Sequence, residues 1–204
     1  PANMGVGADK IGKTGPVTKS TWDYSFKWKP AHFNTIDFLV TTKKAESGID
    51  VITPIFQEGI NANSTSQIDE YKTIVLRCGF DERKHGYLNP CQDVINDVLP
   101  SVKNMDNDDS YKPVQFYPTN PYDVSAGICN IMLKKDDTGS AQMYTEENEV
   151  FGDNTIVEFR YETTNNKQWR WVPLRVRYDK TAELRQGLKN FGNAYHVANS
   201  NWHS

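Results

Sequence analysis

The sequence predicts a mainly β domain, folded as a small barrel or sandwich with a few short helices. Aromatic and β-branched residues gather in short runs, and spacers rich in turn-forming residues separate these runs. The chain has 204 residues, of which 37% are hydrophobic, so it is long enough to bury one sizeable core. The predicted strands are two within residues 25–42, hinged at Pro30, and one each in residues 51–56, 72–80, 114–117, 128–134, 155–161 and 168–177.

Helical spacing of apolar residues occurs in two further places. It runs from Val94 to Leu99, where Pro100 stops it, and this predicts a short helix between strands. It resumes after Asp179 and continues, interrupted by glycines, to a second short helix around residues 194–202. The polar stretches 104–111 and 134–139 are expected to be exposed loops.

Charge and cysteine content narrow the possible classes of protein. The formal net charge is −3, so the chain has no global basic field, and any contact with a polyanion must come from a local cluster. Cys78, Cys91 and Cys129 are odd in number and far apart, which predicts free thiols and a reducing compartment. No apolar run is long enough to span a bilayer, and the polar first residues lack the core of a signal peptide. We therefore expect an intracellular, cytoplasmic protein without a membrane partner.

A first basic pair lies in the run Phe26-Lys27-Trp28-Lys29-Pro30. Side chains alternate along a strand, so Lys27 and Lys29 share one face while Phe26 and Trp28 share the other. Two neighbouring ammonium groups repel each other unless an anion such as a phosphate lies between them. The pattern is compatible both with a phosphate site and with a solvated strand face.

A second basic cluster lies near the other end of the chain. In a strand through residues 168–177 and onward, Arg175, Arg177 and Asp179 are expected to share one face. Arginine forks match phosphate oxygens, and the carboxylate would hold one fork in place. Pro173 removes one backbone donor and predicts an edge or a bulge. The alternative interpretation is a surface ladder of ion pairs.

Longer motifs around both clusters resemble those of a known family. FKWKP followed by NTIDF resembles the fifth nucleotidyltransferase motif of mRNA guanylyltransferases, and R-x-R-x-D-K at Arg175 to Lys180 resembles their sixth motif. The run Ile156 to Phe159 resembles the strand before the sixth motif, and Asn193-Ala194-Tyr195 resembles the family's Asn-Ala-Tyr, delayed by an insertion of residues 181–192. The sequence of the C-terminal stretch most resembles that of the multifunctional capping enzymes of large DNA viruses.

This resemblance implies a fold and a set of domains. Residues 1–31 would be the C-terminal edge of a nucleotidyltransferase domain, residues 32–191 an OB-fold barrel with insertions, and residues 192–204 the start of a linker to a methyltransferase domain. In such enzymes the OB domain closes over GTP during transfer of GMP, through a lysyl-GMP intermediate, to the diphosphate 5′ end of RNA. If the chain is viral, the virus factory or the virion is the expected location.

The resemblance also implies the site. Lys27 and Lys29 would contact the α-phosphate of GTP, whereas Arg175, Arg177 and Lys180, oriented by Asp179, would contact the β- and γ-phosphates. A Mg or Mn ion would assist, with ligands mostly outside this stretch. The nucleophilic lysine belongs to a K-x-D-G motif that this sequence lacks, so the isolated chain is expected to be inactive.

Two other functions remain open from the sequence. One is the OB domain of an ATP-dependent nucleic acid ligase, which shares the mechanism and a basic last motif. The other is a non-catalytic OB module that binds single strands or scaffolds a neighbouring domain. For strand binding, Tyr111, Phe116, Tyr117 and Tyr122 are candidates for a platform on which RNA bases stack. Cys78, His85 and Cys91 are irregularly spaced and predict no zinc site.

Overall fold

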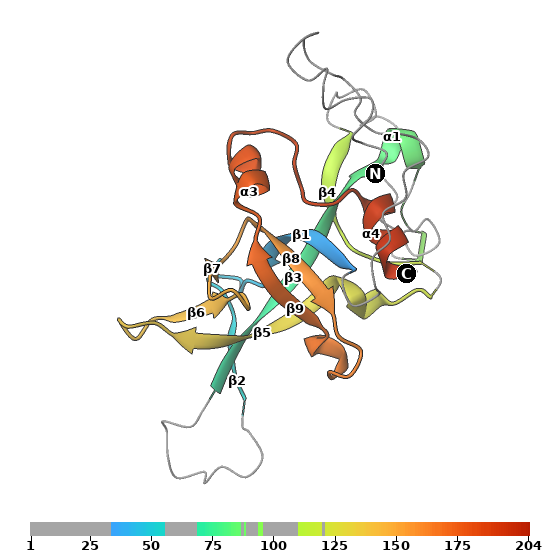
Figure 1. Cartoon of the computed structure of the whole chain (residues 1–204). Coiled ribbons are helices and arrows are strands. Elements are labelled where there is room, and N and C mark those ends of the chain that lie inside the picture. Colours follow the sequence, from blue (N-terminus) through green and yellow to red (C-terminus); the bar gives the residue numbers. More distant parts are fainter. Residues whose placement is uncertain (1–33, 56–68, 87, 89–93, 96–109, 120) are drawn as a thin grey trace, which may run out of the picture. The chain divides into compact units, whose positions relative to one another are not determined.

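The computed structural model describes residues 34–55, 69–86, 88, 94–95, 110–119 and 121–204. The compact unit to which they belong spans Asn34–Ser204. Within this part of the chain nine strands form one antiparallel sheet that curls into a nearly closed barrel, with a few short helices around it (Figure 1). The predicted mainly β barrel is therefore confirmed, and the architecture is consistent with an OB fold. No helix of the described residues is long and apolar enough to cross a membrane.

The sheet has a central path with two strands beside it. Its order is β7-β6-β5-β3-β1-β8-β9, and β2 and β4 each pair with β3. The strands are β1 (Thr35–Thr42), β2 (Ile52–Ile55), β3 (Asp69–Asp81), β4 (Tyr111–Gln115), β5 (Ile128–Lys135), β6 (Ala141–Tyr144), β7 (Val150–Phe151), β8 (Thr155–Tyr161) and β9 (Trp171–Val176). The helical elements are α1 (Glu82–His85), the 3-10 turns η5 (Val124–Gly127) and η6 (Lys167–Trp169), α3 (Tyr178–Arg185) and α4 (Tyr195–Trp202).

The long strand β3 organises the barrel because it pairs with four partners. Its first half lies between β2 and β5, and its second half lies between β1 and β4. The ring then continues from β1 to β8 and from β8 to β9. Glu158 pairs with Arg175 and Phe159 pairs with Pro173, so Leu174 is the extra residue of a bulge in β9 next to Pro173, as the proline predicts.

The loop after β6 closes the barrel against β9. The backbone N–H groups of Glu146 and Glu147 donate to the carbonyl oxygens of Pro173 and Leu174, at 2.9 and 3.2 Å. The N–H of Val176 donates to the Glu149 carboxylate at 2.6 Å. Two backbone hydrogen bonds and one carboxylate therefore complete the ring in place of a regular strand pair.

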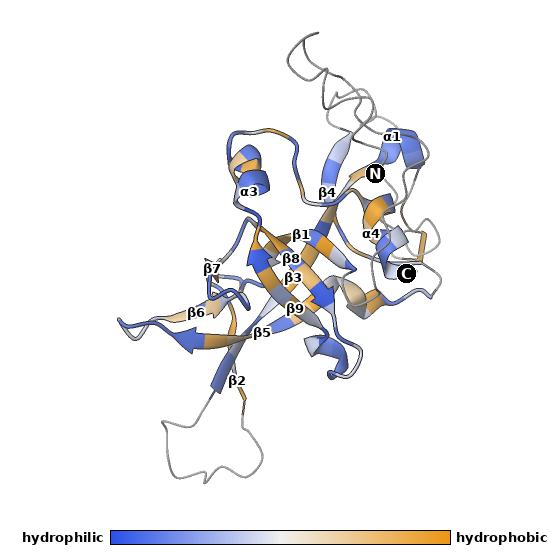
Figure 2. Cartoon of the chain, viewed as in Figure 1, coloured by the Kyte–Doolittle hydropathy of each residue, from blue (hydrophilic) through white to orange (hydrophobic). Residues whose placement is uncertain are grey.

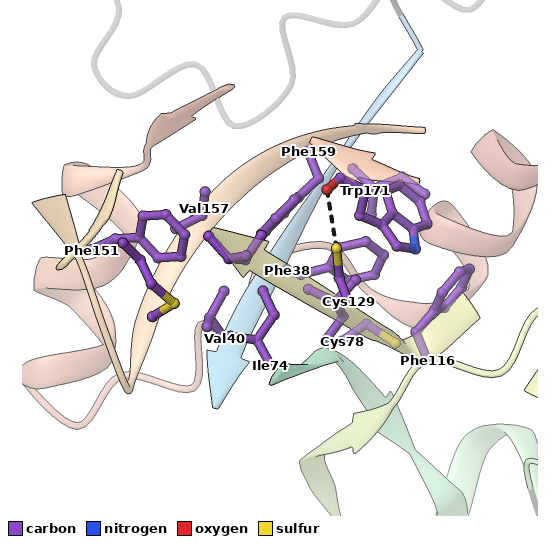
Figure 3. Packing of buried hydrophobic residues seen from close by; sticks show 14 of the residues in the cluster. Phe38, Val40, Ile74, Cys78, Phe116, Cys129, Phe151, Val157, Phe159 and Trp171 are labelled. Atoms are coloured by element: carbon purple, nitrogen blue, oxygen red, sulfur yellow. Dashed lines mark hydrogen bonds between the residues drawn. The ribbon is translucent and has the colours of Figure 1, made fainter. Parts of the chain in front are cut away.

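The core fills the barrel with aromatic rings from several strands. Phe38 is fully buried and contacts Phe116 and Trp171, with ring centroids 5.2 and 5.0 Å apart (Figure 3). The indole N–H of Trp171 donates to the carbonyl of Ala126 at 2.7 Å, and its own carbonyl accepts from the Cys129 thiol. Phe116 is fully buried, so its predicted place in a stacking platform is wrong and its ring belongs to the core.

The short helices differ in how much they contribute to the core. The sequence of α1 is hydrophilic throughout, whereas α4 carries hydrophobic residues in its first half (Figure 2). In α4, Ala198 is fully buried and Trp202 packs against Tyr161, with centroids 4.8 Å apart. Residues 192–204, predicted as the start of a linker, thus pack on the barrel instead.

Most predicted elements lie close to the observed ones. The prediction for residues 155–161 coincides with β8, and residues 134–139 form the end of β5 and its turn into β6, where Asp136 accepts hydrogen bonds from Thr138 and Ser140. The strand predicted for residues 168–177 begins later, at Trp171, because η6 precedes it. The helix expected after Val94 and the strand around Pro30 fall largely outside the described residues.

Candidate functional site

A row of charged side chains crosses the outer face of β1, β8 and β9. In the strand register Asp37 lies opposite Glu158, and Glu158 lies opposite Arg175. The neighbours of Asp37 along β1, Ile36 and Phe38, are buried in the barrel core. Because side chains alternate along a strand, the row points away from that core.

Asp37 forms ion pairs with two cations of the sixth-motif segment. Arg177 Nη1 and Lys180 Nζ both donate to Asp37 Oδ2, the latter at 2.7 Å. The Asp37 side chain is 7% exposed, against 25% for Arg177 and 22% for Lys180. A carboxylate this deeply buried is costly unless it is paired, and here two cations share one oxygen. The pairing fixes Arg177 and Lys180 next to each other.

Asp179 extends the cluster toward solvent. Arg177 Nη2 lies 3.2 Å from Asp179 Oδ2, and the Asp179 side chain is 65% exposed. The hydrogen bond from Arg177 lowers the pKa of Asp179 below its ordinary value, so the group is ionised at neutral pH. Asp179 does not share a strand face with the two arginines as predicted, because β9 ends at Val176 and Asp179 lies in the first turn of α3.

Arg175 is the most exposed cation of the cluster, and it pairs with Glu158. Its Nε donates to Glu158 Oε2 at 2.6 Å, while the other carboxylate oxygen accepts from the Thr35 hydroxyl at 2.6 Å. Burial acts to raise the pKa of Glu158, but the bonds from Thr35 and Arg175 outweigh it and lower that pKa below the usual range. The same pairing raises the pKa of Arg175.

Helix α3 brings Lys180 to β1 because two hydrogen bonds tie its start to β8. The N–H of Arg177 donates to the carbonyl of Ile156 at 2.8 Å. The N–H of Ile156 donates in turn to the hydroxyl of Thr181 at 3.0 Å, and Thr181 is almost fully buried. The direction of α3 is therefore set by the core strand beneath it.

The segment after the insertion returns to the same strand. Asn193 accepts the N–H of Asp37 with its side-chain oxygen at 2.7 Å and donates its own N–H to the carbonyl of Asp37 at 2.8 Å. Gly192, at a φ of 84°, lies so close that a Cβ there would be 2.3 Å from the carbonyl oxygen of Asp37. Only glycine fits both the positive φ and this approach. The Asn-Ala-Tyr segment thus fixes the backbone that carries the buried carboxylate.

The structure brings together four of the six residues predicted to bind phosphate. Arg175, Arg177, Asp179 and Lys180 lie in one cluster, whereas Lys27 and Lys29 lie outside the described residues. The sequence prediction did not include Asp37 as a site residue. The available signal was that Asp37 is the one charged residue of β1, inside the NTIDF run.

Within the described ranges no group of three or more His, Cys, Asp or Glu side chains is arranged to hold a metal ion. The carboxylates of the charged cluster are instead committed to Arg175, Arg177 and Lys180. The cluster therefore does not fit a divalent cation. Its chemistry is that of ion-paired guanidinium and ammonium groups.

Comparison with known proteins gives one informative relative. No family model matches the chain, and no solved structure matches it. The chain is 27% identical over 187 residues to a probable mRNA-capping enzyme of Acanthamoeba polyphaga mimivirus. The match covers 87% of this chain but 12% of that relative. The predicted resemblance to a viral capping enzyme is thus confirmed, as likeness of most of this chain to one segment of a much longer protein.

Proposed function

We propose that this chain is the OB-fold part of an mRNA guanylyltransferase and that its charged cluster binds the β- and γ-phosphates of GTP. One observation carries the proposal: Arg177 and Lys180 are held together on the buried Asp37, next to Arg175 in the same row. Charge-assisted N–H donors placed side by side on fixed backbone are what a polyphosphate requires. The likeness to a probable mRNA-capping enzyme supports the same conclusion.

The proposed reaction proceeds in two displacements. A lysine from the nucleotidyltransferase domain attacks the α-phosphorus, the bond to the bridging oxygen of the β-phosphate breaks, and pyrophosphate leaves. The terminal phosphate oxygen of diphosphate RNA then attacks the same phosphorus and releases the lysine. Negative charge grows on the pyrophosphate in the first step, and Arg175, Arg177 and Lys180 would stabilise it there.

The cluster is suited to this role because its internal ion pairs do not use all the N–H donors of its cations. A guanidinium has five N–H donors and an ammonium has three. Arg177 pairs through two nitrogens and Lys180 makes one bond to Asp37, so further donors remain for phosphate oxygens. Asp179 is the most exposed carboxylate of the cluster, and its bond to Arg177 is the one that a phosphate would most readily replace.

The rest of the active site is proposed to come from outside this stretch. The sequence contains no K-x-D-G, so the nucleophile would lie in the nucleotidyltransferase core. Lys27 and Lys29 would bind the α-phosphate, and a Mg or Mn ion would be held by carboxylates of that core. A methyltransferase domain of the parent protein would then modify the capped RNA.

Transfer of label from α-labelled GTP to the parent protein tests the proposal. With Arg177→Ala we expect lysyl-GMP formation to slow by about a hundredfold or more, the usual effect of removing one preorganised donor. Arg160→Ala is the matched control, because Arg160 makes a surface ion pair with Glu146 at 3.2 Å. Normal labelling of Arg177→Ala would contradict the proposal, and preferential labelling by ATP would favour a ligase.

A further inference from the structure

A cavity with a volume of ≈ 370 Å³ lies where β3, β4, α1 and the start of α4 meet. Phe80, Tyr111 and Tyr195 form its inner walls, and Lys84, His85 and His196 line it from α1 and α4. Its size is within the range of small-molecule sites in proteins. None of these residues belongs to the charged cluster on β1, β8 and β9.

The inner walls are aromatic and well fixed. Phe80 and Tyr195 meet edge to face, with ring centroids 5.5 Å apart, and the Tyr195 hydroxyl donates to the carbonyl of Tyr117 at 2.8 Å. Tyr111 lies directly on the backbone of Gly79, where a Cβ would be 1.9 Å from its hydroxyl oxygen. The cavity therefore has a rigid inner surface that suits a flat ring.

The outer edge is basic. Lys84, His85 and His196 are exposed, and the two imidazole rings lie 5.9 Å apart although they come from different helices. Asp81, whose side chain is mostly buried, also lines the cavity; it caps α1 by accepting the N–H groups of Arg83 and Lys84 at 3.1 and 3.3 Å, and lies 3.5 Å from the Lys84 ammonium. The carboxylate of Asp81 is thus hydrogen-bonded within α1, and Lys84, His85 and His196 supply N–H donors at the edge.

We propose that this cavity binds one nucleotide of a single-stranded RNA, with the base against the aromatic walls and its phosphate at Lys84, His85 and His196. An aromatic pocket whose edge carries an ammonium and two imidazoles as N–H donors matches a unit that is flat and apolar at one end and anionic at the other. A peptide side chain would use the walls but would not need the edge. A free phosphate would use the edge but not the walls.

The position of the cavity relates it to the charged cluster. Asn193 donates to and accepts from the backbone of Asp37, and its carbonyl accepts the N–H of Gly79 at 3.1 Å. One residue therefore contacts both the strand that carries the cluster and the floor of the cavity. That the bound single-stranded RNA is the RNA to be capped rests on the proposed function. Binding of single-stranded RNA itself is measured without GTP.

Fluorescence anisotropy of a short labelled RNA with the full 204-residue chain tests the inference. The double variant His85→Ala, His196→Ala should weaken binding about tenfold, as loss of a stacking or charged contact does, and Lys84→Ala should weaken it and flatten its salt dependence. Lys135→Ala, at an exposed lysine on β5, is the control and should bind like the parent chain. All the altered side chains are exposed, so thermal unfolding should change little.

Two results would overturn the inference. One is equal RNA affinity of the parent chain and both cavity variants. The other is competition by free GMP as strong as by RNA at the same nucleotide concentration, which would assign the cavity to a free nucleotide. Because the readout needs no lysyl-GMP, failure of the labelling test on Arg177→Ala would leave this result standing on its own.

Discussion

Asn193 and Asp37 bind each other through two hydrogen bonds although they are 156 residues apart, one at 2.7 Å from the Asp37 N–H to the amide oxygen and one at 2.8 Å between their backbones. The strand that carries the buried carboxylate is thus held by the segment that follows the insertion. The stability of the charged cluster should depend on both residues.

Replacement of Asn193 by alanine should destabilise the chain by about 1–3 kcal/mol, because the N–H of Asp37 loses its acceptor in a partly buried place. Urea unfolding followed by circular dichroism measures the change. Asn166→Ala is the matched control, since Asn166 is exposed and makes no side-chain capping bond. Equal stability of the two variants would show that the contact has no energetic role.

Removal of the Asp37 carboxylate should be more damaging than removal of the Asp179 carboxylate. Asp37→Ala leaves Arg177 and Lys180 partly buried without their shared partner, and truncation of one member of a buried pair costs about 3–5 kcal/mol. Asp179 is largely exposed, so Asp179→Ala should cost less than about 1 kcal/mol. Denaturant midpoints of the two variants give the comparison, and similar losses would contradict the burial argument.

Acid sensitivity should arise in part at Asp50. Burial acts to raise its pKa, but hydrogen bonds from Lys44, Thr42 and Lys72 outweigh burial and hold the pKa far below its ordinary value. The folded pKa is depressed, so the stabilisation is complete above the unfolded pKa of about 4 and is lost as pH falls through the folded value. Urea unfolding between neutral pH and about pH 3 should therefore show the gap between the parent chain and Asp50→Asn shrinking in acid. A constant gap would argue against the linkage.

The thiols of Cys78 and Cys129 should be unreactive while the chain is folded. Both are buried, and burial raises the pKa of each to about 12. Thiolate is the reactive form, so alkylation near pH 8 should be very slow. In a Cys91→Ser background, a thiol reagent should titrate both groups only after denaturant is added. Rapid modification of the folded chain would show that the core opens readily.

The sequence predicted what depends on local pattern. The run from Thr155 to Tyr161 is rich in β-branched and aromatic residues, and β8 has those bounds. The basic side chains of the sixth motif were recognised from their own spacing and from the resemblance. The bulge near Pro173 followed from its missing N–H.

What depends on distant partners could not be predicted. Asp37 is buried because Arg177 reaches it from 140 residues further along the chain, and no local pattern encodes that meeting. Phe116 sits in a proline-rich run typical of a surface loop, yet Phe38 and Trp171 enclose its ring. Asp179 left the strand face because α3 starts directly after β9, and strand alternation ends where the helix begins.

The way in which the barrel closes has a consequence for its motion. Among the described residues, the loop after β6 is joined to β9 by two backbone hydrogen bonds and one carboxylate, so this seam has no continuous ladder like that of the strand pairs along the ring. Amide protons of Glu146, Glu147 and Val176 should exchange with deuterated water earlier than those of β1 and β3. Local opening of this seam would release β9, which carries Arg175 and leads to Arg177, while the other strand pairs of the barrel stay hydrogen-bonded.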